Sequence, residues 1–112
     1  MDKEELEKLT RDYQLVQEQL QALAIQREQF SAQKEEQKTA LAEVTKTTGK
    51  VYMSVGGVVV ETSKDDALKD IKDRQDSTEM RLGIINKQYD EFSKREKSLR
   101  TSITEALKGE KV

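Results

Sequence analysis

The sequence predicts a mainly α-helical fold, a long antiparallel two-helix coiled coil with a single β-hairpin at the bend. Two segments, residues 3–44 and 64–108, are rich in good helix formers and contain no proline. In both segments apolar residues recur at alternating steps of three and four. Between them the chain changes to β-branched residues and glycine. We therefore expect one domain over residues 1–112, with helices at about 3–44 and 64–108 and a hairpin at about 50–62.

The composition is that of long solvated helices rather than of a globular core. Charged residues make up 38% and apolar residues 34% of the 112 residues, with no tryptophan. Low hydrophobicity with high charge is also typical of disorder. The net charge is only −2, however, because 20 basic residues balance 22 acidic ones, and there is no proline. Balanced charge of this kind favours exposed helical surfaces.

Several functional classes are excluded by residues that the chain lacks. It has no histidine and no cysteine. Disulfides, thiol nucleophiles, the usual zinc sites and imidazole chemistry are therefore excluded, and we expect neither an enzyme nor a cofactor or metal. The chain has no basic stripe, so binding to nucleic acid is not expected. No apolar run is long enough to span a membrane, and the charged N-terminus lacks a signal-peptide core, so a cytoplasmic protein is expected.

The apolar residues follow a heptad pattern in both helical segments. Of the 24 a and d positions, 18 are apolar, where chance would place about eight, and such a pattern specifies a left-handed supercoil. We call these positions the seam. In the first segment they are Leu6, Leu9, Tyr13, Val16, Leu20, Leu23, Arg27, Phe30, Lys34, Gln37, Leu41 and Val44. In the second they are Leu68, Ile71, Gln75, Thr78, Leu82, Ile85, Tyr89, Phe92, Glu96, Leu99, Ile103 and Ala106.

The two seams match when the chain is folded back on itself. Pairing positions whose numbers sum to 112 places Val44 opposite Leu68 and Leu6 opposite Ala106. The same register brings polar positions together, with Gln37 facing Gln75 and Lys34 facing Thr78. Two positions fit this register less well. They are Arg27, which faces Ile85, and Glu96, which faces Val16.

Two β-rich runs, 51–55 and 58–62, flank Gly56-Gly57 and predict a hairpin with a two-residue turn. After it, Ser63 and Asp66 resemble a capping box that opens the second helix. One face of the hairpin is almost wholly apolar, and a lone two-stranded hairpin is marginal in water. We expect an oligomer interface at Val51, Met53, Val55, Gly56, Gly57, Val58 and Val60. The alternative is that this face packs on the end of its own coiled coil.

The run from Val51 to Thr62 also carries a family resemblance. This run resembles the hairpin of β-class prefoldin subunits of archaeal type, which combines an aromatic residue, Val-Gly-Gly and a hydrophobic triplet. The matching residues are Tyr52, Val55-Gly56-Gly57 and Val58-Val59-Val60. The resemblance covers essentially the whole chain, and the span between the helices has room for only one hairpin, whereas the α class has two. The second glycine at position 57 departs from most members and is similar to one eukaryotic β-type subunit, so the source stays open.

The resemblance implies a chaperone subunit. Two α-type and four β-type subunits would form a hexamer, with their hairpins assembled into a β-barrel platform that carries coiled-coil tentacles. The tentacle tips would hold non-native proteins without ATP and deliver them to a group II chaperonin. We expect client binding by apolar residues near the open end of the coil, namely Leu6, Leu9, Leu15, Ile103, Ala106 and Leu107.

Other readings of these features remain. Leu15, Ile25, Ile84 and Leu107 fall outside the seam and are expected to face solvent, where single apolar residues usually have no function. The rival function is a structural coiled-coil tether that uses its hairpin only to oligomerise. Clients, their affinities and the residues that contact a chaperonin do not follow from the sequence, nor does the ability to form homo-oligomers.

Overall fold

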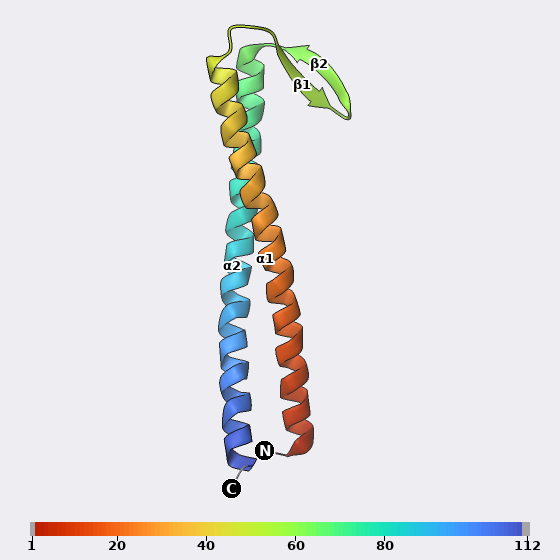
Figure 1. The fold of residues 1–112 in the computed structure, drawn as a ribbon, viewed down its shortest axis with the longest axis vertical. Helices are drawn as coiled ribbons and strands as arrows, with labels where there is room; N and C mark the ends of the chain where they lie inside the picture. Colours follow the sequence, from red (N-terminus) through yellow and green to blue (C-terminus); the bar gives the residue numbers. More distant parts are fainter. Residues whose placement is uncertain (1, 111–112) are drawn as a thin grey trace. The chain divides into compact units, whose positions relative to one another are not determined.

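The computed structural model describes residues 2–110 and contains two long helices joined by a hairpin (Figure 1). Helix α1 spans Lys3–Lys46 and helix α2 spans Lys64–Glu110. Strands β1, Val51–Val55, and β2, Val58–Thr62, form a two-stranded antiparallel sheet. The predicted mainly α-helical fold with a single hairpin is confirmed, and both helices end slightly beyond the predicted residues 44 and 108.

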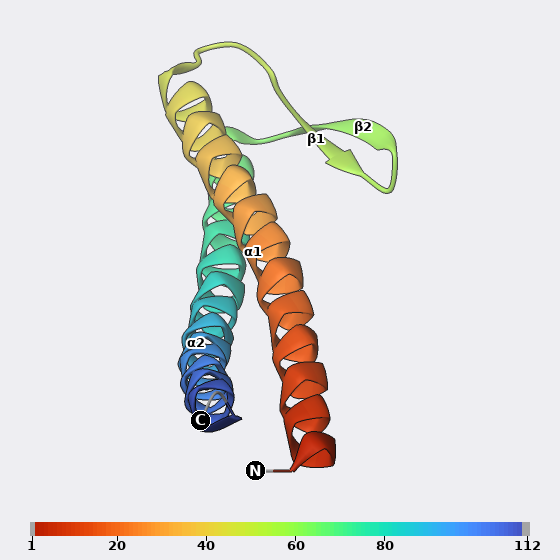
Figure 2. The same cartoon turned by 60° about the horizontal axis from the view of Figure 1, so that its bottom comes forward.

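The chain forms two compact units, each with part of both helices. The first unit comprises the described residues up to Arg27 and from Ile84 onward, and the second comprises Glu28–Gly83. In each unit the α1 segment runs antiparallel beside the α2 segment (Figures 1 and 2). The antiparallel pairing predicted from the heptads is therefore present in both units.

The seam positions are the ones that the helices bury. Every seam position except Lys34 is buried or half-buried. Val16 is 3% exposed, and Leu23 and Ile85 are each 6% exposed. The burial follows the heptad because only the a and d side chains of a two-stranded coil point at the partner helix.

A polar layer interrupts the seam of the second unit. The side-chain amide of Gln37 donates a hydrogen bond of 2.8 Å to the hydroxyl oxygen of Thr78, which is 5% exposed. The sequence placed Gln75 opposite Gln37, so the observed contact joins neighbouring layers of the predicted register. Among the described residues, the buried Oε1 of Gln37 has no hydrogen-bond partner. Polar seam residues thus meet here, but not in the predicted pairs, and one acceptor is left unsatisfied.

Lys34 leaves the seam for an ion pair on the surface. Its Nζ lies 2.9 Å from Oε1 of Glu79, and both side chains are largely exposed. The hydrogen bond between them raises the pKa of Lys34 and lowers the pKa of Glu79, and their opposite charges act in the same direction. Because solvent screens such exposed pairs, this pair contributes little to stability.

Two seam residues that fit the predicted register poorly, Arg27 and Glu96, contact tyrosine side chains in the first unit. The guanidinium of Arg27 lies 4.1 Å from the centre of the Tyr89 ring, a cation–π geometry. Oε1 of Glu96 accepts a hydrogen bond of 3.1 Å from the hydroxyl of Tyr13. That hydroxyl accepts one of 2.8 Å from the amide of Gln17. Charged residues are tolerated here because each has a specific partner.

The hairpin has the predicted register and turn. Val55 pairs with Val58, Met53 with Val60 and Val51 with Thr62. Gly56 and Gly57 have φ angles of 56° and 84°, so both central residues of the turn are left-handed, as a type I′ turn requires. Glycine adopts this conformation without the steric cost that a Cβ brings.

Side chains cap the N-terminal ends of both helices. The backbone N–H of Asp66 donates to the hydroxyl of Ser63 at 3.1 Å, which confirms the Ser63 side of the predicted capping box. At the start of α1, the N–H of Glu5 donates to the carboxylate of Asp2 at 2.8 Å. This second cap was not predicted, although aspartate three residues before a glutamate is a typical signal.

Candidate functional site

The apolar face of the hairpin is covered at its base and open at its turn. Val51 is buried at 9% exposure, and Met53 is half-buried. Toward the turn, Val55 is 53% and Val58 is 61% exposed, and Val60 is also exposed. Only the half of the face next to the turn is therefore available to another molecule.

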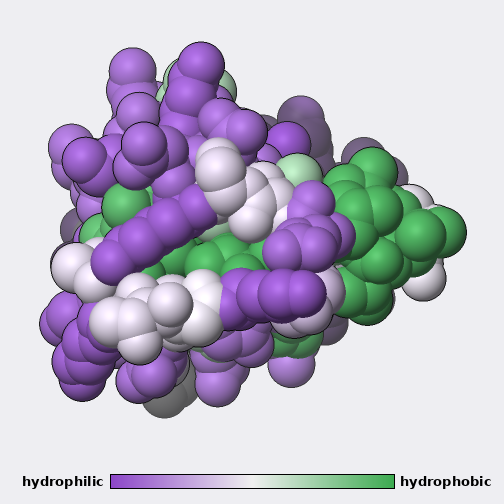
Figure 3. Space-filling model, turned by 90° about the horizontal axis from the view of Figure 1, so that it is seen from above, coloured by the Kyte–Doolittle hydropathy of each residue, from purple (hydrophilic) through white to green (hydrophobic). Residues whose placement is uncertain are grey.

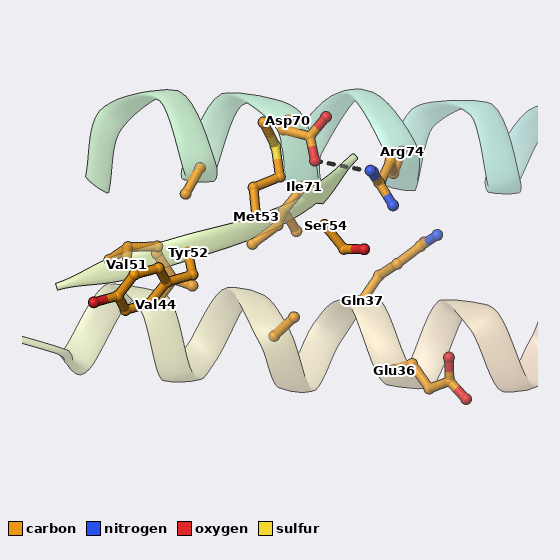
Figure 4. Close-up of a pocket in the computed structure, with 12 residues that line it drawn as sticks. Glu36, Gln37, Val44, Val51, Tyr52, Met53, Ser54, Asp70, Ile71 and Arg74 are labelled. Atoms are coloured by element: carbon orange, nitrogen blue, oxygen red, sulfur yellow. Dashed lines mark ion pairs between the residues drawn. The ribbon is translucent and has the colours of Figure 1, made fainter. Parts of the chain in front are cut away.

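The base of the hairpin packs against the helices of its own unit. Val51 and Met53 line an open pocket of about 310 Å³ together with Val44 of α1 and Ala67 and Ile71 of α2 (Figure 4). Ala67 is itself only 6% exposed. The alternative prediction, that this face packs on the end of its own coiled coil, therefore holds for Val51 and Met53. The helix ends provide more apolar surface than the sequence suggested.

The opposite face of the hairpin is also partly apolar. Tyr52 is 57% exposed and Val59 is 67% exposed. Seen from above, hydrophobic side chains gather on the side where the hairpin projects (Figure 3). An exposed surface of valines on both faces of a short hairpin is unusual for a chain that stays alone in water.

Lys64, at the start of α2, forms hydrogen bonds with the backbone at the end of α1. Nζ of Lys64 donates hydrogen bonds to the carbonyl oxygens of Thr45 and Thr47, at 2.8 Å and 3.2 Å. These carbonyls lie at the C-terminal end of α1 and just after it, where carbonyls lack helical partners. The sequence gives no signal for this contact, because a lysine at the start of a helix normally faces solvent.

The predicted client-binding residues fall into two groups in the first unit. The seam residues Leu6, Leu9, Ile103 and Ala106 are half-buried. Leu15 and Leu107 lie outside the seam and are 60% and 45% exposed. The structure thus offers two freely exposed leucines and four partly covered seam residues.

Other exposed apolar residues lie along the helices. Ile25 and Ile84 are each 54% exposed, as their positions outside the heptad predict. Met80, in the second unit, is 64% exposed and was not among the predicted exposed residues. The heptad could have identified it, because it lies two residues after Thr78, on the outer side of its helix.

The part of the chain that the structure describes contains no cluster of three or more acidic residues that could hold a metal ion. No helix within this part is long and apolar enough to cross a membrane.

Comparison with known proteins relates this architecture to one family. The family model described as Prefoldin subunit matches residues 4–110. The chain is 38% identical over 96 residues to prefoldin subunit beta of Methanosarcina acetivorans, covering 84% of this chain and 82% of the relative. It is 34% identical over 94 residues to prefoldin subunit beta of Pyrococcus furiosus, with 82% and 80% covered.

A solved structure agrees with the sequence comparison. The crystal structure of the prefoldin beta subunit from Thermococcus strain KS-1 superposes with a TM-score of 0.85 at 28% identity, covering 92% of each chain. The family match over residues 4–110 agrees with the fold, which has two long helices and a single hairpin between them. The chain belongs to the prefoldin subunit family and is similar to its beta subunits.

Proposed function

We propose that this protein is an ATP-independent holdase subunit of a cytoplasmic prefoldin complex. In this proposal it has no catalytic role. It captures non-native proteins with apolar residues at its helix tips and delivers them to a group II chaperonin. The tips are the start of α1 and the end of α2. The single observation that carries the proposal is the family match over residues 4–110.

The proposed complex contains two α-type and four β-type subunits, this chain being a β-type subunit. Its hairpin joins the hairpins of the other subunits in a β-barrel platform. The exposure of Val55, Val58 and Val60 supports this role, because the chain leaves these valines uncovered. Gly56 and Gly57 complete the interface by giving the turn its tight type I′ shape.

The proposed client-binding surface is a weak and unselective apolar grip. Leu15 and Leu107 are exposed among charged residues. Leu6, Leu9, Ile103 and Ala106 are half-buried at the helix ends, where fraying exposes seam residues further. Such scattered apolar contacts suit partners that share exposed hydrophobic segments but no common sequence.

The function is tested by refolding a denatured, aggregation-prone protein in the presence of this chain and an α-type partner. We expect the complex to suppress light scattering without ATP. The variant Leu107→Ser should weaken this suppression, whereas Met80→Ser, at another exposed apolar position outside the tips, should not. A well-formed complex that leaves light scattering unchanged would reject the holdase role and favour the structural tether.

Assembly is tested separately from client binding. Charged substitutions at Val55 and Val60 should keep the helical circular dichroism signal but abolish the large complex in native mass measurement. Ser54→Asp is the matched control, because Ser54 is already polar and lies on the other face. A large complex that persists with both valines charged would show that this face is not the interface.

A further inference from the structure

The C-terminal end of helix α1 lacks the usual cap. The helix ends at Lys46, and the last carbonyl groups of a helix have no partner within it. Helices commonly end on a left-handed residue, usually glycine, that satisfies these carbonyls. Among residues 2–110, only the two glycines of the hairpin turn have a positive φ. The end of α1 is therefore capped in another way.

The cap is the side chain of Lys64, the first residue of α2. Its Nζ donates hydrogen bonds to the carbonyl oxygens of Thr45 and Thr47, at 2.8 Å and 3.2 Å. A cation is unfavourable at the N-terminal end of its own helix, where the helix dipole is positive, and favourable at a C-terminal end. Because the start of α2 lies beside the end of α1, the ammonium acts on the favourable end of the neighbouring helix (Figure 1).

These hydrogen bonds restrain the longer of the two connections to the hairpin. Residues 47–50 join α1 to β1, whereas Ser63 alone joins β2 to α2. Ser63 is fixed, because its hydroxyl accepts the N–H of Asp66 and so caps α2. On the other side, Lys64 holds the carbonyl of Thr47. Both connections of the hairpin are thus tied to the first turn of α2.

The restrained connection leads directly into the docked base of the hairpin. Val51 is 9% exposed and lines the pocket with Val44 of α1 and Ala67 of α2 (Figure 4). This pocket is open and has a volume of about 310 Å³, so space remains beneath the base. Atoms that line such a space lose part of their contact energy. The restraint of the connection therefore contributes a larger share of the free energy that keeps the base in place.

We propose that Lys64 is a positioning residue that holds the base of the hairpin against the helices of its own chain. By binding Thr47 to the start of α2, it reduces the conformational entropy that the connection loses when Val51 docks. The hairpin then projects in one orientation, and its uncovered valines meet a partner without a further ordering cost. Only this last step rests on the proposed function of the hairpin in assembly.

Amide hydrogen exchange of the full-length chain, followed residue by residue by NMR, tests this role. A two-stranded hairpin is marginal once it leaves the helices, so exchange of the amides of β1 and β2 reports how often the base opens. The interaction of one cation with a helix end corresponds to about a two- to five-fold change in an equilibrium constant. We expect Lys64→Met to speed hairpin exchange by about this factor.

Two variants serve as controls. Lys64→Arg keeps the positive charge and can donate to both carbonyls, so it should restore the exchange rate of the parent. Lys50→Met removes a positive charge from the same connection, but the structure, which describes this residue, shows no bond from Lys50 to the end of α1. We expect its hairpin exchange to match that of the parent.

Two further measurements separate positioning of the hairpin from simple capping of α1. In a Val51→Ala background the base has lost packing, so Lys64→Met should add little to the exchange rate, because both changes act on the same docking step. Lys64 is exposed, and 1 M salt screens its charge. The difference in exchange between the parent and Lys64→Met should therefore shrink in 1 M salt.

The outcomes keep this inference separate from the proposed function. Equal exchange rates for Lys64→Met and Lys50→Met would overturn the proposal, and so would a full effect of Lys64→Met in the Val51→Ala background. Failure of Lys64→Arg to restore the parent rate would also overturn it. A parent chain that forms no complex with an α-type partner would refute the proposed assembly but would not change these rates, which are measured on the single chain.

Discussion

Replacing Leu23 by alanine tests whether the seam stabilises the first unit. Leu23 is 6% exposed and lies in the heptad of α1. The change removes about three carbon atoms from a buried site, and each is worth about 0.8 kcal/mol, or about 2.4 kcal/mol in total. Any cavity that remains adds to this loss. A two-helix seam can partly close around the gap, so we expect the free energy of unfolding to fall by about 2–3 kcal/mol.

The measurement is urea unfolding followed by circular dichroism at a helical wavelength, with Ile25→Ala as the matched control. Ile25 lies two residues away on the same helix and in the same unit, but it is 54% exposed. Alanine is the better helix former, and an exposed site loses little contact. We therefore expect the control to change the free energy of unfolding by no more than about 0.5 kcal/mol.

The comparison of the two variants shows whether burial in the seam stabilises the first unit. The helical signal of both should match that of the parent before unfolding begins. If Leu23→Ala and Ile25→Ala lowered the free energy of unfolding equally, burial in the seam would not explain stability. A changed dependence on urea concentration for Leu23→Ala would instead show that the unfolded or native state had altered its compactness.

Three further predictions follow from the second unit. Replacing Gln37 by leucine together with Thr78→Val should raise the free energy of unfolding by about 1 kcal/mol, because the unpaired Gln37 Oε1 disappears, and unfolding in urea measures this. Glu79→Gln should remove a small stabilisation that the Lys34–Glu79 pair provides. In the parent this stabilisation is present above pH 4.5, is lost as the pH falls through the lowered pKa of Glu79, and is also removed by 1 M salt. Unfolding measured at several pH values detects it. Gly57→Val should destabilise the hairpin by about 1–2 kcal/mol relative to Gly57→Asn, because φ is +84°, and amide exchange of β1 and β2 reports it.

The helices and the hairpin could be predicted because each follows from a local pattern. The heptad predicts burial at every seam position, and the structure buries or half-buries all of them except Lys34. That exception has a physical reason, since a long flexible side chain can leave the seam and reach Glu79 on the surface. The turn could be predicted equally well, because Gly56-Gly57 between two β-rich runs is typical of a two-residue hairpin turn.

Contacts between residues that are far apart in the sequence were harder to predict. The ring of Tyr89 under Arg27 and the Tyr13–Glu96 hydrogen bond depend on how neighbouring layers interlock. A heptad specifies which side of a helix is buried, but not which of two adjacent layers a long side chain reaches. The hydrogen bonds of Lys64 to two carbonyls depend in the same way on the path of the connection, which no periodicity describes.

The packing of the hairpin base on its own coiled coil was only the alternative prediction, because the apolar seam residues were expected to face one another. Val44 belongs to the last predicted layer, opposite Leu68, and Ile71 to the layer before it. A side chain in a terminal layer has a neighbouring layer on only one side, so part of its apolar surface remains open. Val51 and Met53 cover that surface and are covered by it in return.

This mutual cover divides the apolar residues of the hairpin by their distance from the helices. Near the base, Val51 is buried and Met53 is half-buried within one chain, so assembly can add less there. Near the turn, Val55, Val58 and Val59 remain more than half exposed. The hydrophobic driving force is proportional to the apolar area removed from water. A partner therefore gains most by covering the turn and β2, so substitutions at Val58 and Val59 should weaken assembly more than equivalent substitutions at Val51, which act first on the fold of the chain itself.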